Sequence, residues 1–381
     1  MPPDTGLLEY SLNENHGYVF AVTKSDISVH DLSSTTEINR LVRTAYETWS
    51  TPTPTTSTAA IELAERILDP VSPLLRHIKH LLLVTDGSLQ FVPFSALPSP
   101  KSLSPNQDNL LVHFTLQTLP SVTFIHTIRA THLINQTPPS MIAVLADPVF
   151  STDDPRVQST HSQARPDENQ TTRSFVPLRN ELPHAFPMPR LIHSREEAEA
   201  IAAVAPSNRL TLALGFAATR DTALSTAFTH SRITHYATHA VFDATNPALS
   251  GLIFSMVDKH GLPQSGFVTL QEIFRTRFSA DLIVLSSCQT ALGEDLSNGD
   301  GLISLTYGFL YAGAHSIVGT LWEVDDASTS EFMRLFYTGI LRNRLKPAEA
   351  LHEAQLNMSR SQHWADPYYW AGFVIQGDPG L

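Results

Sequence analysis

The sequence predicts an α/β fold in which a largely parallel sheet is flanked by helices. Short apolar segments alternate along the chain with amphipathic ones, as strands alternate with their crossover helices. The segment Leu282–Leu285 is apolar on both faces, which is typical of a central strand in a parallel sheet. No repeat of fixed period accompanies this alternation, which excludes a solenoid.

Residues 1–138 are predicted to form an N-terminal subdomain. Turn residues between apolar runs indicate strands over residues 7–12, 18–23, 27–32 and 80–85. Amphipathic periodicity indicates helices over residues 37–49 and 59–68. A segment rich in Pro and Thr separates these two helices and lacks helical periodicity.

Residues 139–381 are predicted to form a second domain. Strands are expected over residues 141–146, 210–214, 233–240, 252–257, 282–285, 316–321 and 373–376. Helices are expected over residues 194–204, 219–229, 269–275, 328–340 and 347–359, with a further helix opened by the turn 298–301. Ser194 with Glu197, and Ser328 with Glu331, have the spacing of capping boxes. The polar stretch 151–189 lacks periodicity and is expected to be a mobile loop.

The composition argues against several classes of partner. The chain carries 25 Lys and Arg against 37 Asp and Glu, a formal net charge of −12. Binding nucleic acid or an anionic membrane surface needs a basic face, so neither partner is expected. We find no apolar run long enough to cross a bilayer and no basic segment leading into a signal sequence. A single cysteine in the chain indicates a reducing, cytoplasmic location.

The chain has one cysteine, Cys288, which excludes an internal disulfide and a zinc site built from several thiolates. A lone cysteine is either a small buried hydrophobic residue or a reactive thiol, and its surroundings decide. Cys288 follows the apolar run 282–285, and His239 closes the apolar strand 233–240. Active groups gather at the carboxyl ends of parallel strands.

A cysteine and a histidine at neighbouring strand ends suit acyl transfer. The imidazole takes the thiol proton, and the thiolate then attacks a carbonyl. Backbone amides stabilise the oxyanion that forms. His239 precedes Cys288 by about 50 residues, the order and spacing known for caspases.

The sequence also resembles the CHAT domain family, caspase- and separase-related peptidases that are often fused to tetratricopeptide (TPR) repeats. The resemblance covers almost the whole chain and is most specific in the C-terminal 150 or so residues. The matching segments are 235–239, 243–255, 281–294, 299–302, 309–314, 320–326, 368–373 and 377–379. Segments 85–87 and 91–94 are similar to the degenerate, pseudo-peptidase subdomain that begins the family's fold.

The resemblance implies a caspase-like sheet and a cysteine endopeptidase that cleaves a specific protein partner. Cys288 would be the nucleophile and His239 the base, with the backbone amides of Cys288 and Ala240 forming the oxyanion hole. Ala240 stands where the family usually has Gly, and a positive φ there would cost an Ala about 1–2 kcal/mol. No cofactor or metal is implied. The function would be regulated proteolysis, such as bacterial defence or cell death, with an activating or TPR-containing protein as a further partner.

Several alternatives stay open at this stage. A non-catalytic caspase-like interaction module competes with the peptidase, and another cysteine acyl-transfer enzyme is a third reading. His235 would lie on the same strand face as His239, either supporting the site or filling the core. Asp325 and Asp326 follow strand 316–321 and would either line a pocket for a basic or otherwise polar substrate residue or serve a helix N-terminus.

Overall fold

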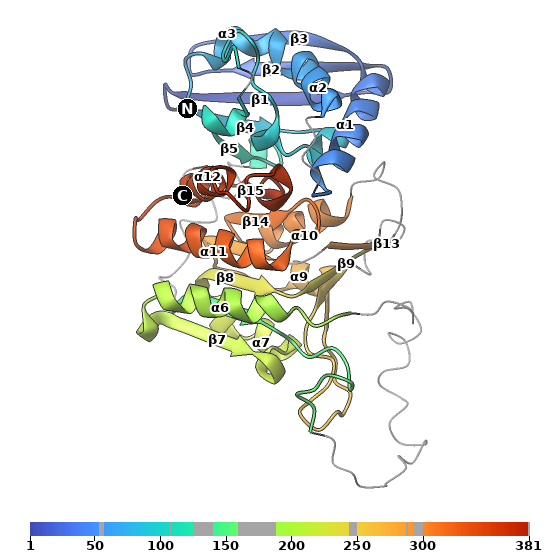
Figure 1. The fold of residues 1–381 in the computed structure, drawn as a ribbon, viewed down its shortest axis with the longest axis vertical. Coiled ribbons are helices and arrows are strands. Elements are labelled where there is room, and N and C mark those ends of the chain that lie inside the picture. The colour runs from blue at the N-terminus through green and yellow to red at the C-terminus, as the bar shows by residue number, and fades with distance from the viewer. Residues whose placement is uncertain are drawn as a thin grey trace.

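A computed structural model describes residues 1–52, 57–106, 108–124, 140–158, 188–243, 250–286, 289–292 and 300–379. It confirms the predicted α/β fold: a large, mostly parallel sheet flanked by helices (Figure 1). Most of the expected polar loop 151–189 lies outside the described residues, as do residues 298 and 299 of the expected turn, whereas Asp300 and Gly301 begin the helix Asp300–Tyr311. None of the helices described is long and apolar enough to span a membrane.

The large sheet contains eleven strands in the order β3-β2-β1-β4-β5-β15-β14-β12-β8-β6-β7. Two runs of neighbouring strands are parallel: β1, β4, β5 and β15 in one, and β14, β12, β8, β6 and β7 in the other. The pairs β1–β2, β2–β3 and β14–β15 are antiparallel. The strands are β1 Thr5–Leu12, β2 His16–Val22, β3 Ile27–Ser34, β4 His80–Val84, β5 Thr115–Thr118, β6 Ser140–Ala146, β7 Leu210–Leu214, β8 Ser231–Ala237, β12 Leu282–Leu285, β14 Ser316–Thr320 and β15 Phe373–Gly377.

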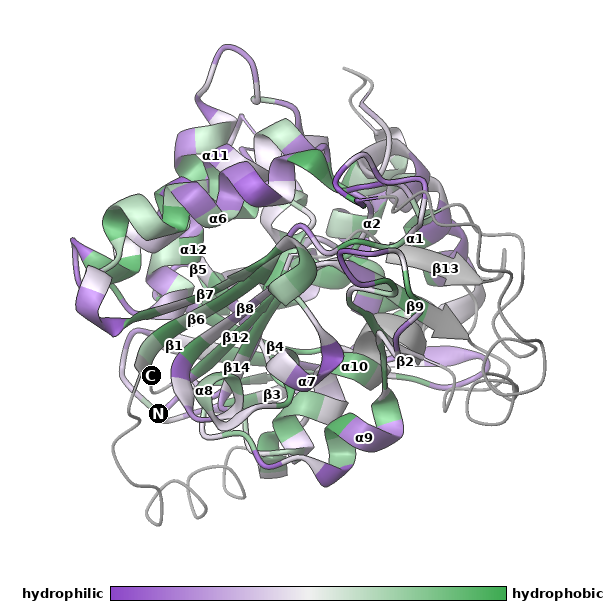
Figure 2. Ribbon diagram, turned by 90° about the horizontal axis from the view of Figure 1, so that it is seen from below, coloured by the Kyte–Doolittle hydropathy of each residue, from purple (hydrophilic) through white to green (hydrophobic). Residues whose placement is uncertain are grey.

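Helices cover both faces of the C-terminal part of this sheet. Helices α6, α11 and α12 form one layer, and α7 to α10 lie on the other side (Figure 2). Helix α1 packs on α2 in the N-terminal part. The helices are α1 Thr35–Trp49, α2 Thr58–Leu68, α3 Ser72–Leu75, α6 Ile192–Val204, α7 Arg220–Ala223, α8 Thr226–Thr229, α9 Leu270–Arg275, α10 Asp300–Tyr311, α11 Asp326–Leu341 and α12 Pro347–Ser359.

A second sheet of four short strands lies beside the carboxyl end of β8 and β12, with β9 and β13 visible at the right of Figure 1. Its order is β11-β10-β9-β13. The strands are β9 His239–Asp243, β10 Gly251–Ile253, β11 Phe267–Thr269 and β13 Gln289–Leu292. The predicted strand 233–240 was therefore wrong as one element, because the chain leaves the large sheet at Thr238 and re-pairs as β9 in the small one.

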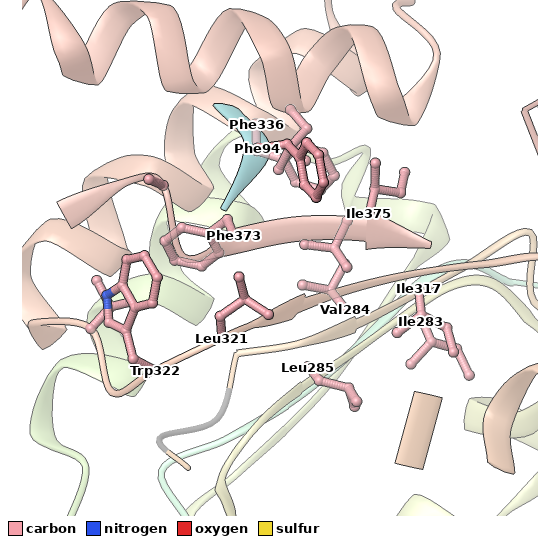
Figure 3. Packing of buried hydrophobic residues seen from close by; sticks show 14 of the residues in the cluster. Phe94, Ile283, Val284, Leu285, Ile317, Leu321, Trp322, Phe336, Phe373 and Ile375 are labelled. Carbon is pink, nitrogen blue, oxygen red and sulfur yellow. The ribbon is translucent and has the colours of Figure 1, made fainter. Parts of the chain in front are cut away.

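One hydrophobic core extends through the N- and C-terminal parts of the chain. Phe94 from the N-terminal part belongs to the same buried cluster as Phe336 and Phe373 (Figure 3). The sheet is also continuous, because Gln376 of β15 pairs with Thr118 of β5. The boundary near residue 138 stays a prediction, since a shared core and sheet neither require nor exclude two folding units.

Polar contacts reinforce this junction. The hydroxyl of Tyr46 in α1 donates to the carbonyl of Leu321, which follows β14, at 2.7 Å. The ring of Tyr46 meets Trp322 edge-on at a centroid distance of 5.9 Å. The amide of Gln117 donates to the carbonyl of Gly377 at 3.2 Å. Contacts between segments this far apart in sequence exist only once both parts have folded.

Two of the predicted helix starts were wrong. Helix α11 begins at Asp326 because Asp325, not Ser328, is its N-cap: the Asp325 carboxylate accepts the amide of Ser328 at 2.9 Å. Helix α6 begins at Ile192, and its Glu197 side chain is buried against the sheet instead of capping the helix. In both cases a residue with the right spacing for a capping box has another structural role.

The Tyr46 hydroxyl generates a stability prediction. Tyr46→Phe removes one hydrogen bond and leaves the ring contacts in place, so we expect the free energy of unfolding to fall by about 1–2 kcal/mol. Chemical denaturation measures this change, with Tyr18→Phe as the control because Tyr18 is exposed on β2. Equal stability of the two variants would show that the Tyr46–Leu321 bond contributes nothing to the junction.

Candidate active site

Two chain segments leave the large sheet side by side and pair again in the small one. In the large sheet, Leu285 of β12 lies opposite Tyr236 of β8 in a parallel ladder. The amide of Ser286 then donates to the carbonyl of Tyr236 at 3.0 Å. In the small sheet, Gln289 of β13 lies opposite Ala240 of β9, again in parallel. Both ladders join residues 49 positions apart, so the register is the same before and after the gap.

His239 and Cys288 occupy corresponding positions in these two segments. His239 directly precedes Ala240, and Cys288 directly precedes Gln289. Cys288 itself lies outside the described residues, as does Ser287. The structure therefore describes the strand on either side of the expected nucleophile but not the nucleophile itself.

The imidazole of His239 is held by a backbone carbonyl. Its Nε2 lies 2.8 Å from the carbonyl oxygen of Pro189. A carbonyl can only accept, so Nε2 carries the proton in this hydrogen bond. In the neutral ring, Nδ1 is then the unprotonated nitrogen and the one able to act as a base.

His239 is nearly buried, with 5% of its surface exposed. The ring of Phe150 packs on it at a centroid distance of 4.8 Å. Burial lowers the pKa of His239 below its ordinary value, because the imidazolium loses hydration. The hydrogen bond to Pro189 and the charges of Glu323 and Asp326 oppose this shift. The neutral imidazole, the form that accepts a proton, is thus favoured.

His235 belongs to a buried polar cluster below the strand ends. Its Nδ1 lies 3.0 Å from the hydroxyl of Tyr337 in α11. Its Nε2 lies 3.1 Å from Oε1 of Glu197, an ion-pair distance without the alignment of a hydrogen bond. The other carboxylate oxygen of Glu197 accepts from the hydroxyl of Ser286 at 3.0 Å. Glu197 of α6 therefore connects the strand that leads to His239 with the segment that leads to Cys288.

His235 and His239 do not share a face of one strand, contrary to the prediction. The chain bends at Thr238, whose side-chain hydroxyl donates to the carbonyl of Ile253. His235 stays in the large sheet while His239 begins the small one. A role for His235 in supporting the site stays a prediction, and it would act through Glu197 and Tyr337.

The two aspartates differ in their surroundings. The carboxylate of the exposed Asp325 caps α11. Asp326 is half-buried and lines a cavity of about 20 Å³, enough for roughly one water molecule. Glu197 and Ser286 line the same cavity. Burial raises the pKa of Asp326, and the nearby Glu197, Asp325 and Glu323 raise it further, whereas His193 lowers it.

The backbone at Ala240 shows no strain of the kind that would require glycine. Ala240 lies within β9 and does not have a positive φ. In the described parts of the chain, the non-glycine residues with a positive φ are Asp147 and Arg344. The same parts hold no group of three or more His, Cys, Asp or Glu arranged to bind a metal ion. Acyl transfer by a thiol requires neither a metal nor a cofactor.

Four residues around His239 and the described strand ends were not identified as site residues from the sequence. Pro189 and Phe150 contact the imidazole, and Glu197 and Asp147 are buried carboxylates next to the strand ends. Asp147 carried a usable signal, because it directly follows the apolar strand 141–146 just as His239 and Cys288 follow theirs. Pro189 carried none, since its contribution is a backbone carbonyl.

Comparison with known proteins gives a family and a fold. The CHAT domain model matches residues 58–378. Tetratricopeptide repeat protein 28 of Mus musculus is 29% identical over 343 residues, and its Homo sapiens counterpart is 26% identical over 346 residues. The alignments cover 80% of this chain but 12% of each relative, so the chain spans about an eighth of their length.

The fold is shared with separase. In the separase–securin complex of Saccharomyces cerevisiae, a region equal to 30% of the matched chain superposes on 98% of this chain. The TM-score is 0.52 at 10% sequence identity. At that identity the match shows the fold alone, a caspase-like sheet with flanking helices.

The packing of Phe150 on His239 generates a prediction about pH. Phe150→Ala exposes the imidazole to water, so we expect the pKa of His239 to rise towards 6.5, its ordinary value. Because the folded pKa is depressed, His239 contributes stability above about pH 6.5, and this contribution is lost as the pH falls through the folded pKa. An NMR titration of the imidazole measures the pKa, with Phe267→Ala from the same small cluster as control. A His239 pKa that is not depressed in the unmodified protein, or one that shifts equally in both variants, would refute this reading.

Proposed function

The chain belongs to the CHAT domain family, and from this premise we propose that it is a cysteine endopeptidase with Cys288 as nucleophile and His239 as base. The observation that carries the proposal is the register shared by the β8–β12 and β9–β13 ladders. His239 and Cys288 are each one peptide bond from the paired residues Ala240 and Gln289. A pairing held on both sides of the gap supports a short distance between thiol and imidazole.

The state of the imidazole suits general base catalysis. With Nε2–H directed to the Pro189 carbonyl, Nδ1 can accept the proton of the Cys288 thiol. The thiolate attacks the scissile carbonyl, and the imidazolium then returns the proton to the departing amine. Water, deprotonated by His239, cleaves the thioester and releases the acid and the free thiol. No external oxidant, metal or cofactor enters this sequence.

The oxyanion formed in each step needs backbone donors. We assign this role to the amides of Cys288 and Ala240, as the family resemblance implies. Ala240 is buried, at 1% exposure, within a strand that is paired on both sides. Serving the oxyanion therefore requires the Ala240 amide to become accessible when a substrate carbonyl binds.

The substrate is proposed to be a specific protein partner with a basic residue before the cleaved bond. Asp326 carries this proposal better than Asp325, because Asp326 lines the cavity next to Glu197 and Ser286 whereas the carboxylate of Asp325 caps α11. Glu197, Glu323 and Asp325 surround Asp326 with negative charge, opposed by His193, and this balance favours a further cation. A guanidinium would require the 20 Å³ cavity beside Asp326 to widen. The relatives are named for tetratricopeptide repeats, which supports a TPR-containing protein as a further partner.

A non-catalytic interaction module is the second candidate. The observation that favours it is the burial of His239, whose 5% exposure restricts access to a substrate carbonyl. The two candidates differ in whether any substrate is cleaved, and the first prediction separates them.

Cys288→Ala and His239→Gln are each expected to abolish proteolysis. Gln can still donate a hydrogen bond to Pro189 but cannot act as a base. Because the two residues act as a unit, the double variant should be no worse than either single one. The measurement is a proteome-wide screen for new protein N-termini, with His16→Ala, at an exposed histidine, as the control. Cleavage that persists in Cys288→Ala would exclude the cysteine mechanism, and no cleavage by the unmodified protein would favour the interaction module.

Asp326→Asn is expected to reduce the preference for Arg or Lys over an apolar residue before the cleaved bond by about tenfold or more. Asp325→Asn retains an N-cap oxygen and should leave this preference unchanged. A fluorogenic peptide library varied at that single position measures both. If the unmodified enzyme prefers apolar residues, or if Asp326→Asn has the same preference as the unmodified enzyme, Asp326 is not part of the specificity pocket.

A further inference from the structure

A fully buried carboxylate, that of Asp147, lies at the carboxyl end of β6 and is surrounded by three guanidinium groups. Arg190 contacts it with two nitrogens, Nε to Oδ1 at 2.8 Å and Nη2 to Oδ2 at 3.0 Å. Arg195 of α6 and Arg156 each contact Oδ2 at 2.8 Å. Asp147 has 0% of its surface exposed. A carboxylate removed from water persists as an anion only when it is paired in this way.

The backbone of Asp147 is also fully engaged. Its amide donates to the hydroxyl of Ser194 at 3.0 Å, and its carbonyl accepts from Arg156 at 2.9 Å. Asp147 has a φ of 54°, an uncommon conformation for a residue with a side chain. Such a conformation persists where the surroundings hold it in place. Asp147 is therefore rigidly held, and a chain segment that binds its carboxylate is held in place with it.

Arg190 connects Asp147 to the imidazole of His239. The Pro189 carbonyl and the Arg190 amide share one planar peptide unit. That carbonyl accepts the Nε2–H of His239 at 2.8 Å. On the other side, Met188 packs against the small cluster that contains Phe150. Residues 188–190 are thus held at both ends, by apolar packing at Met188 and by the two-pronged ion pair at Arg190.

We propose that Asp147 and Arg190 are positioning residues for His239: their ion pair fixes the Pro189 carbonyl, which selects the Nε2–H tautomer and leaves Nδ1 as the base. Neither residue touches the reacting atoms. The kinetic consequence rests on the proposed peptidase function, whereas the effect on the tautomer does not. Arg156 and Arg195 neutralise Asp147 but have no peptide bond to Pro189, so they contribute to charge balance rather than to orientation.

The test compares two arginines that contact the same carboxylate. Arg190→Lys keeps the charge and loses the two-pronged geometry, whereas Arg195→Lys makes the same change outside the path to Pro189. Nitrogen-detected NMR above pH 7 reports which nitrogen of His239 carries the proton, with signals assigned by their loss in His239→Gln. We expect a single Nε2–H tautomer in the unmodified protein and in Arg195→Lys, and a mixture of both tautomers in Arg190→Lys. Asp147→Asn should behave like Arg190→Lys if it folds.

The outcomes separate this inference from the proposed function. If the tautomer of Arg190→Lys equals that of the unmodified protein, or if Arg195→Lys shifts it as much, the inference is wrong. With an active enzyme, Arg190→Lys should lower kcat about tenfold at unchanged KM, because ground-state binding does not involve the imidazole. If the unmodified protein cleaves nothing, the proposed function fails while the tautomer result still decides the inference.

Discussion

The parallel register between the two segments that end in His239 and Cys288 is the constraint on which the site depends. A ladder shifted by one residue would turn every side chain to the opposite face. Here Leu285 faces Tyr236 in one sheet and Gln289 faces Ala240 in another, at the same offset. The offset between the two segments is therefore the same on both sides of the change of sheet. The site is thus a property of strand pairing, and the helices contribute by fixing the strands from either side.

Burying charged groups at this edge of the sheet costs free energy of desolvation, and each of the two buried carboxylates described here contacts specific partners. Glu197 takes the Ser286 hydroxyl and lies beside His235, so one carboxylate of α6 contacts both strand segments. The carboxylate of Asp147 forms ion pairs with three arginine side chains. Breaking such a pair leaves an uncompensated charge in a medium of low polarity, which is more destabilising than never having buried it. These groups therefore favour one arrangement of α6 against the sheet.

Sequence reasoning predicted the α/β fold and the family resemblance, and both are confirmed. Periodicity and Pro347 predicted the limits of α12 because its signals are local. The strand β13, Gln289–Leu292, was missed because its apolar content is low and its stability comes from pairing with β9, about 50 residues away in the chain. Glu197 was misread as a helix cap for the same reason: its partners lie on strands distant in sequence. The roles of His239 and Cys288 stay predictions that no comparison tests.

The most direct test of the account is the alkylation rate of Cys288, the only thiol in the chain, as a function of pH. A thiol paired with an imidazole is partly ionised at neutral pH, so iodoacetamide should label it rapidly well below its ordinary pKa of about 8.5. In His239→Gln the labelling curve should move up to that value. A curve that rises only near pH 8.5 in the unmodified protein, and is unchanged in His239→Gln, would contradict the pairing of Cys288 with His239.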